Sequence, residues 1–187
     1  MQHSRSHATR KLTTMAMLAA VSIVLVALIH FPLLPAAPFL EYDPADIPIL
    51  IGTFLFGPWA GLGLTVVVSI LQGVTVSAAS GGPIGILMHV LATGSYVLVC
   101  GFIYKHHKTR KTAIIGLAAG VVTMAVVMCG CNLVFTPIFM GQPIQTVVEM
   151  LVPVIIPFNL LKGGINALVT YIVYKPISRT VHHLIEK

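Results

Sequence analysis

The chain has 187 residues, of which 57% are hydrophobic and only 9% are charged, and its mean hydropathy is +0.96. A soluble domain usually carries about 25% charged residues, so this composition excludes a water-soluble globular domain and predicts an integral membrane protein. The formal charge of +6 does not indicate nucleic-acid binding, because the basic residues stand at the ends of apolar runs and not on one solvated face. The length fits a single membrane domain, residues 1–187.

Apolar runs of the length that crosses a bilayer, about 20 residues, recur along the chain. We predict an all-α bundle of six transmembrane helices in residues 12–174, between tails at 1–11 and 175–187. The predicted helices cover residues 12–31, 47–56, 59–76, 84–104, 112–135 and 146–174. The first run exceeds the apolar part of a signal peptide, about 7–15 residues, so we expect it to be retained as a helix. The second reaches only about half of the hydrocarbon thickness, so it starts earlier or is partly embedded.

The distribution of Lys and Arg predicts the orientation of the bundle. Outside the helices these residues gather before the first helix, between the fourth and the fifth, and after the sixth: Arg5, Arg10, Lys11, Lys105, Lys108, Arg110, Lys111, Lys175, Arg179 and Lys187. Because cytoplasmic loops are enriched in Lys and Arg, both termini are expected in the cytoplasm, with the bundle in the cell membrane. The acids Glu41, Asp43, Asp46 and Glu149 then all fall on the outer side.

Lys162 is the only basic residue inside a predicted helix and far from its ends. An ammonium at that depth costs at least about 2.5–3.5 kcal/mol on insertion scales, so we expect it to face the protein interior or a wet cavity. Its neighbours Asn159 and Asn166 fall on the same helix face, and Asn132 of the preceding helix could meet them. This stripe indicates a site for a flat, amide-rich ring. The alternative is a lysine satisfied by an acid or by carbonyls, with helix–helix hydrogen bonding, which we favour for Asn166 taken alone.

Two proline-containing segments border this stripe. Pro153 and Pro157 remove N–H donors one turn outward of it, which indicates either an outward-opening pocket or a simple kink. The loop 38–46 mixes aromatics, acids and prolines, and we interpret it as a lid in which Asp46 caps the second helix. The alternative is a solvated loop. His89 could line the pocket from the fourth helix.

Ala16 and Ala20 form a small-xxx-small pair in the first helix, which permits close approach of another helix. We expect Ala19 and Ser22 to enlarge this small face. Intramolecular packing and docking of a partner explain the pair equally well.

No pattern of catalytic or metal-binding residues is present. The sequence contains no phosphate-binding G-x-x-x-x-G-K-[ST] loop, no G-x-S-x-G and no H-E-x-x-H. The three cysteines lie in apolar stretches without the spacing of a zinc site. We therefore predict a binding protein and not an enzyme, without metal or cofactor. If this protein moves its ligand uphill, we expect the energy to come from another subunit.

Three segments resemble the riboflavin-binding S components of energy-coupling factor (ECF) vitamin transporters. They are Phe39-Leu-Glu-Tyr-Asp-Pro-Ala-Asp-Ile-Pro-Ile-Leu-Ile-Gly-Thr-Phe-Leu-Phe-Gly-Pro-Trp-Ala-Gly61, Ile156-Pro-Phe-Asn-Leu-Leu-Lys-Gly163, and Asn132 in Asn-Leu-Val-Phe-Thr-Pro. Ala16 and Ala20 match the family's small-residue motif. The resemblance spans about residues 10–178.

The resemblance implies a six-helix subunit that captures riboflavin from outside. It also implies docking on a membrane coupling (T) subunit carried by two cytoplasmic ATPases, and toppling in the membrane. By resemblance, Asn132, Asn159 and Lys162 fall on flavin-contacting positions, with Leu40 and Tyr42 covering the ring or the ribityl chain. Relatives often carry a Lys-Asn pair in the third helix where this chain reads Val68-Ser69, with Gln72 beyond, so the flavin preferred stays open. The alternatives are an S component for thiamine or a flavin analogue, and a scaffold subunit without ligand.

Overall fold

The computed structural model describes residues 2–35, 37–76 and 82–185. Within these ranges the chain folds into six helical segments, the last of which is continuous through a π-helical turn. The elements are α1 (Gln2–Leu28), β1 (Phe31–Pro32), β2 (Glu41–Tyr42), α2 (Asp46–Phe56), α3 (Pro58–Val74), α4 (Gly82–His106), α5 (Arg110–Met140), α6 (Ile144–Met150), η1 (Leu151–Ile155) and α7 (Ile156–Ile185). The all-α prediction with six helical segments is confirmed. The short antiparallel pair β1–β2, which closes the loop between α1 and α2, was not predicted.

Four of these segments are long and apolar enough to cross a membrane: Ala8–Leu28, Gly82–His106, Arg110–Met140 and Ile144–Pro176. The helices α2 and α3 are apolar but shorter. In α2, the residues from Asp46 to Phe54 are all buried. This short helix therefore belongs to the core of the bundle, which explains why it can be apolar throughout without spanning on its own.

The helices run further than predicted at several ends. α1 begins at Gln2, within the predicted N-terminal tail, and α7 continues to Ile185, within the predicted C-terminal tail. α5 extends to Met140, which leaves only three residues before α6 in place of the longer predicted loop. The physical reason is that the apolar span marks where a helix leaves hydrocarbon, whereas the backbone continues in helical form until a residue breaks it. Gly141 is such a residue, because its φ of 62° ends α5 in the left-handed conformation.

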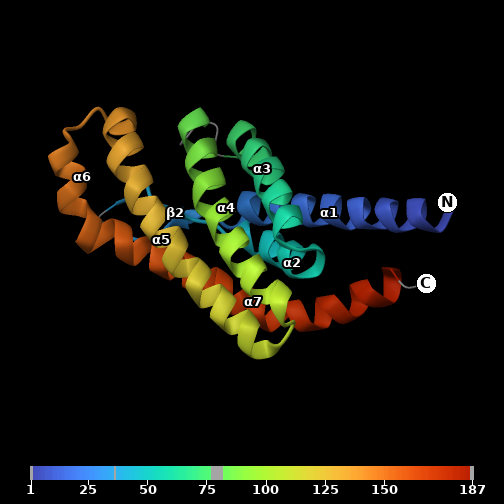
Figure 1. Cartoon of the computed structure of the whole chain (residues 1–187). Coiled ribbons are helices and arrows are strands. Elements are labelled where there is room, and N and C mark those ends of the chain that lie inside the picture. Colours follow the sequence, from blue (N-terminus) through green and yellow to red (C-terminus); the bar gives the residue numbers. More distant parts are fainter. Residues whose placement is uncertain (1, 36, 77–81, 186–187) are drawn as a thin grey trace.

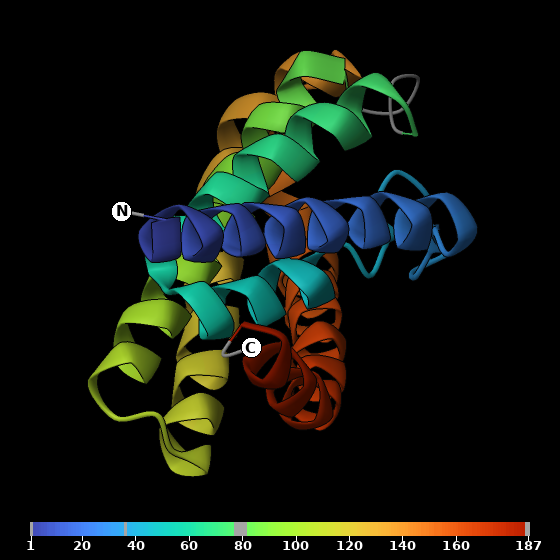
Figure 2. The same ribbon diagram turned by 90° about the vertical axis from the view of Figure 1, so that its right-hand side faces the viewer.

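α3, α4 and α5 stand side by side, and α7 packs obliquely against α5 (Figure 1). α1 lies across the outside of the bundle beside α2 (Figure 2). Close packing of α5 on α4 depends on Gly120, because a Cβ atom there would lie 2.2 Å from the ring of Tyr96, which is fully buried. The small residue lets the two backbones approach, as is common between membrane helices.

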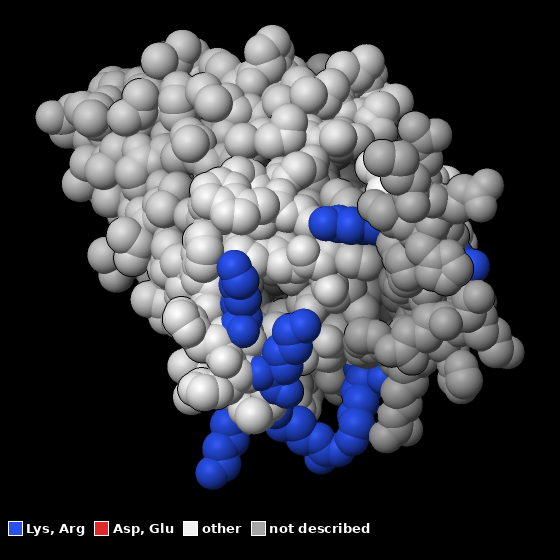
Figure 3. Space-filling model, turned by 45° about the vertical axis from the view of Figure 1, so that its right-hand side comes forward, with Lys and Arg blue, Asp and Glu red and all other residues white. Residues whose placement is uncertain are grey.

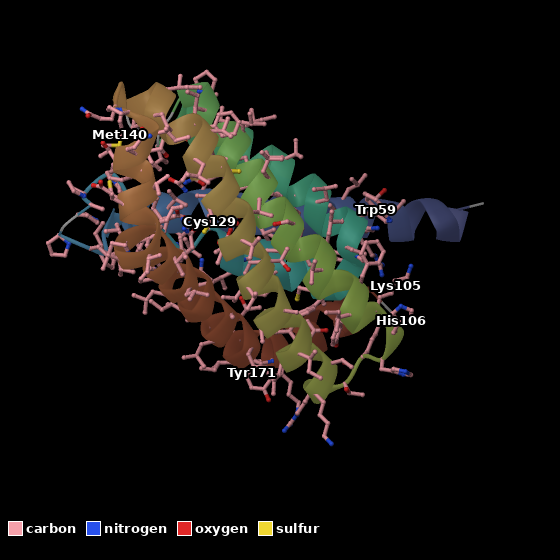
Figure 4. The ribbon with its side chains drawn as sticks, turned by 60° about the vertical axis from the view of Figure 1, so that its left-hand side comes forward. Trp59, Lys105, His106, Cys129, Met140 and Tyr171 are labelled. Atoms are coloured by element: carbon pink, nitrogen blue, oxygen red, sulfur yellow. The ribbon has the colours of Figure 1, made fainter. Side chains whose placement is uncertain are left out.

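The two ends of the bundle differ in charge. Lys and Arg side chains gather over the end where α4 turns into α5, and no acidic side chain shows on the described part of that face (Figure 3). Trp59, Lys105 and His106 lie toward this end, whereas Met140 lies at the opposite end (Figure 4). Both chain termini lie on one side of the molecule (Figure 1). The lysines and arginines of the α4–α5 turn thus lie together as a basic surface at one end of the bundle. The predicted basic segments also include three residues whose side chains lie outside the described part of the structure: Arg5, Arg179 and Lys187.

We expect Gly120→Ala to lower the free energy of unfolding of the purified protein by about 1–3 kcal/mol, because the new methyl group overpacks the α4–α5 contact. The matched control is Gly130→Ala in the same helix, where an added Cβ meets nothing within 4 Å. The control should be neutral or slightly stabilising, since alanine favours the helix. Unfolding of both variants in the same detergent measures the difference, and equal melting temperatures would contradict this account of the contact.

Candidate functional site

A cavity of about 220 Å³ opens at the end of the bundle opposite the basic surface. Its wall is built by the end of α3, the first half of α4, the second half of α5, the start of α7 and the loop before α2. Apolar side chains form much of this wall, among them Leu40, Met124, Met128 and Phe158. A concave, mainly apolar space with a few polar groups is typical of a small-molecule site.

Lys162 reaches the cavity wall from α7 and forms an ion pair with Asp43 of the loop. The Lys162 Nζ atom lies 2.6 Å from Asp43 Oδ2, and both side chains are largely buried. The ammonium is therefore neutralised by an acid of its own chain, which was the alternative considered from the sequence. It also borders a cavity, which was the main expectation. Removing one partner of such a pair leaves a buried charge without compensation.

Asn166 ties the same loop and α2 to α7. Its Nδ2 atom donates to the Asp43 carbonyl at 3.3 Å and to Asp46 Oδ2 at 3.1 Å, and its Oδ1 atom accepts from the Tyr42 hydroxyl at 3.0 Å. Burial raises the pKa of Tyr42, and the neighbouring Asp43 raises it further, so this hydroxyl keeps its proton. The structural role predicted for Asn166 taken alone is confirmed.

Asp46 does not cap α2, so that prediction is wrong. The N-cap residue is Ala45, and no side chain caps this helix. The fully buried Asp46 carboxylate instead turns toward α4, where it accepts a hydrogen bond from Thr93 Oγ1 at 2.8 Å. The solvated-loop alternative is also wrong, since Asp43 and Asp46 are both buried. Side-chain bonds across the bundle outcompete the local cap because the loop packs inward.

His89 extends this polar network to α3. Its Nδ1 atom lies 2.7 Å from Ser69 Oγ, and Ser69 Oγ also lies 2.6 Å from the Thr65 carbonyl. When Ser69 gives its single hydroxyl proton to that carbonyl, His89 Nδ1 must be the donor. His89 Nε2 lies 3.4 Å from Asp46 Oδ1, too far for a well-formed hydrogen bond.

The amides of Asn132 and Asn159 also border the cavity. Asn132 donates to the Met128 carbonyl and accepts from Thr136, each at 2.8 Å. Asn159 donates at 2.8 Å to the carbonyl of Ile155, the last residue of η1. Pro153 lies within η1 and Pro157 follows it, so the predicted loosening takes the form of a π-helical turn. Each amide retains hydrogen-bonding capacity for a ligand.

Two buried polar atoms of the cavity wall have no hydrogen-bond partner in the described structure. They are Gln72 Oε1 and His89 Nε2. A buried polar atom without a partner costs about 1–3 kcal/mol. Both atoms border the same cavity, so a polar ligand in it would satisfy them.

The structure brings most of the predicted ligand residues together around this cavity. Five of them contribute to its wall: Leu40, His89, Asn132, Asn159 and Lys162. Tyr42 is not among the lining residues, and its hydroxyl donates to Asn166 Oδ1. Sequence reasoning missed Asp43 as the partner of Lys162, although a lone lysine in an apolar helix signals that some acid must turn inward.

The small residues of α1 divide between two faces. Ala19 and Ser22 are buried, and Ser22 Oγ donates to the Ala45 carbonyl at 3.0 Å. Ala16 and Ala20 are exposed on the outer face, next to exposed Met17 and Val21. The expectation that all four share one face is therefore wrong. Packing within this chain does not account for Ala16 and Ala20.

The chain is similar to known membrane transport proteins. Residues 10–174 match the family of ECF transporter, substrate-specific component. The riboflavin transporters RibU of Streptococcus thermophilus and Staphylococcus aureus are each 31% identical over 90% of this chain, covering 83% and 90% of their own lengths. The riboflavin transporter FmnP of Bacillus subtilis is 26% identical over 88% of this chain and 90% of its own. A solved structure described as the S component of a bacterial ECF transporter superimposes with a TM-score of 0.78, at 30% identity over 92% of this chain and 98% of that one.

We expect Asp43→Asn and Lys162→Met each to destabilise the ligand-free protein by about 3–5 kcal/mol, because each leaves one buried charge unpaired. The double variant should be more stable than either single variant, since it removes both charges together. Glu149→Gln, an acid-to-amide change at an exposed position of α6, serves as the control and should have little effect. Melting curves of the four variants test this coupling, and strictly additive losses would count against it.

Proposed function

The chain belongs to the substrate-specific S components of ECF transporters, and we propose that the substrate it captures is riboflavin. It is a membrane protein of a transport system and not an enzyme. The proposal of riboflavin is supported by the names of its relatives and by the chemistry of the cavity.

The observation that carries the proposal is the combination of apolar walls with amide and ammonium groups in one cavity. The isoalloxazine ring of riboflavin is flat and apolar on its faces, and one edge carries alternating carbonyl and N–H groups. Asn132 and Asn159 offer both donors and acceptors to such an edge, and Lys162 offers a charged donor. Met124 and Met128 would supply adaptable contacts for the ring faces.

The remaining lining residues suit the ribityl chain. His89 Nε2 and Gln72 Oε1 are unpartnered, and hydroxyl groups can both donate to them and accept elsewhere. Leu40 and the neighbouring loop residues would cover the bound vitamin. In this proposal Tyr42 acts indirectly, by holding Asn166 and with it the loop that carries Asp43.

The basic surface supports an orientation in which both termini and the α4–α5 turn are cytoplasmic, so that the cavity opens to the outside. ATP-driven release would then require a membrane coupling (T) subunit with two ATPases. The exposed small residues Ala16 and Ala20 of α1 are the surface that we propose for docking on the coupling subunit.

We expect the purified protein to bind riboflavin, and Lys162→Ala to weaken binding about 10- to 100-fold, the loss of a charged hydrogen bond. Quenching of flavin fluorescence gives both Kd values. Lys105→Ala, an exposed lysine outside the cavity, is the control and should bind like the wild type. A folded wild-type protein that ignores riboflavin but binds thiamine or another vitamin would refute the proposal.

Replacing Ala16 and Ala20 together by leucine should abolish riboflavin uptake by cells that express the complete transporter, because the bulkier side chains prevent close helix approach. Riboflavin binding by the isolated subunit should persist, since neither residue lines the cavity. Ala27→Leu, also exposed on α1, controls for bulk alone. Normal uptake by the double variant would show that this face does not dock.

A further inference from the structure

The charges around the cavity are unbalanced. Its wall carries three carboxylates, those of Glu41, Asp43 and Asp46, against one ammonium, that of Lys162. Asp43 already pairs with Lys162 at 2.6 Å, so no free positive charge remains from this pair. A negatively charged ligand group would therefore enter a region whose own charge is negative.

Among the described residues, Lys162 is the only lysine or arginine that lines the cavity. The chain has none between Lys11 and Lys105 and none between Lys111 and Lys162. The loop before α2, all of α3, most of α4, and α5 beyond its first turn therefore contribute no lysine or arginine to the wall. Among the described lining residues, His89 is the only other side chain that can become a cation, and Asp46 lies 3.4 Å from it.

The wall also contains hydrogen-bond acceptors to which no described residue donates. The carboxylate of the half-buried Glu41 has no hydrogen bond or ion pair with another described residue. Gln72 Oε1 is buried without a partner. Hydroxyl groups can donate to such atoms, whereas an ionised phosphate brings only further acceptors.

From this geometry we infer that the cavity selects the uncharged vitamin over its 5′-phosphate ester, flavin mononucleotide, by electrostatic exclusion. The inference rests on the proposed function, because it concerns the tail of a bound flavin. A phosphate monoester carries about −1.5 to −2 charges at neutral pH. In a partly desolvated cavity that charge would meet the unpaired Glu41 carboxylate and no free cation among the described lining residues.

The test compares chromatographically repurified riboflavin and flavin mononucleotide on the full chain in nanodiscs of uncharged lipid, by fluorescence quenching. We expect the phosphate ester to bind at least about tenfold more weakly at about 50 mM salt, and the ratio of the two Kd values to shrink at about 500 mM, because salt screens charge. Gln72→Lys places a cation on the wall and should shrink the ratio. Gln72→Met, of similar length and without charge, should keep it.

The outcomes separate this inference from the function on which it rests. Equal Kd values for the two flavins, or tighter binding of the ester, would overturn the inference while leaving riboflavin as the ligand. Discrimination that neither salt nor Gln72→Lys reduces would mean that the phosphate is excluded by its size, which overturns the electrostatic account. Failure of both flavins to bind a folded protein would overturn the proposed function itself.

Discussion

The structure depends on one buried interaction, the ion pair between Lys162 of α7 and Asp43 of the loop before α2. An isolated ammonium or carboxylate in a low-dielectric interior is very costly, so each residue constrains where the other can lie. Asn166 reinforces this constraint through the Asp43 backbone and the Asp46 side chain. The loop is thereby held inward across more than a hundred residues of sequence, and it closes one side of the cavity.

The same network makes the cavity polar in a particular way. Asp46 is shared by Thr93, Asn166 and the nearby His89, so α2, α4 and α7 meet around one carboxylate. Through these contacts and the Lys162–Asp43 ion pair, the charges of Asp43, Asp46 and Lys162 are already bound by groups of the protein itself. The groups left for a ligand are mainly amides, a histidine nitrogen and acceptor oxygens. Such a set favours a neutral molecule with alternating donors and acceptors over an ion.

The two faces of α1 differ in what they contact. Ala19 and Ser22 pack inward and bind the loop backbone, whereas Ala16 and Ala20 face outward with other exposed apolar residues. Under the proposed function, ligand recognition and partner docking would be carried by different surfaces. A change on the outer face of α1 can then alter transport without touching the cavity.

The sequence by itself determined the class of protein, the six helical segments and the exceptional position of Lys162, because composition, apolar length and a buried charge are local properties. It also marked Asn159, since helical spacing places it on the same face as Lys162, and Asn132 as an amide of the preceding helix that could meet that face. Only the tertiary structure decided that Asp43 neutralises Lys162, that Asp46 turns to Thr93 in place of capping α2, and that Tyr42 binds Asn166. These arrangements arise from contacts between segments far apart in the chain. There the need to pair buried charges outweighs local preference, and such pairing leaves no periodic pattern in the sequence.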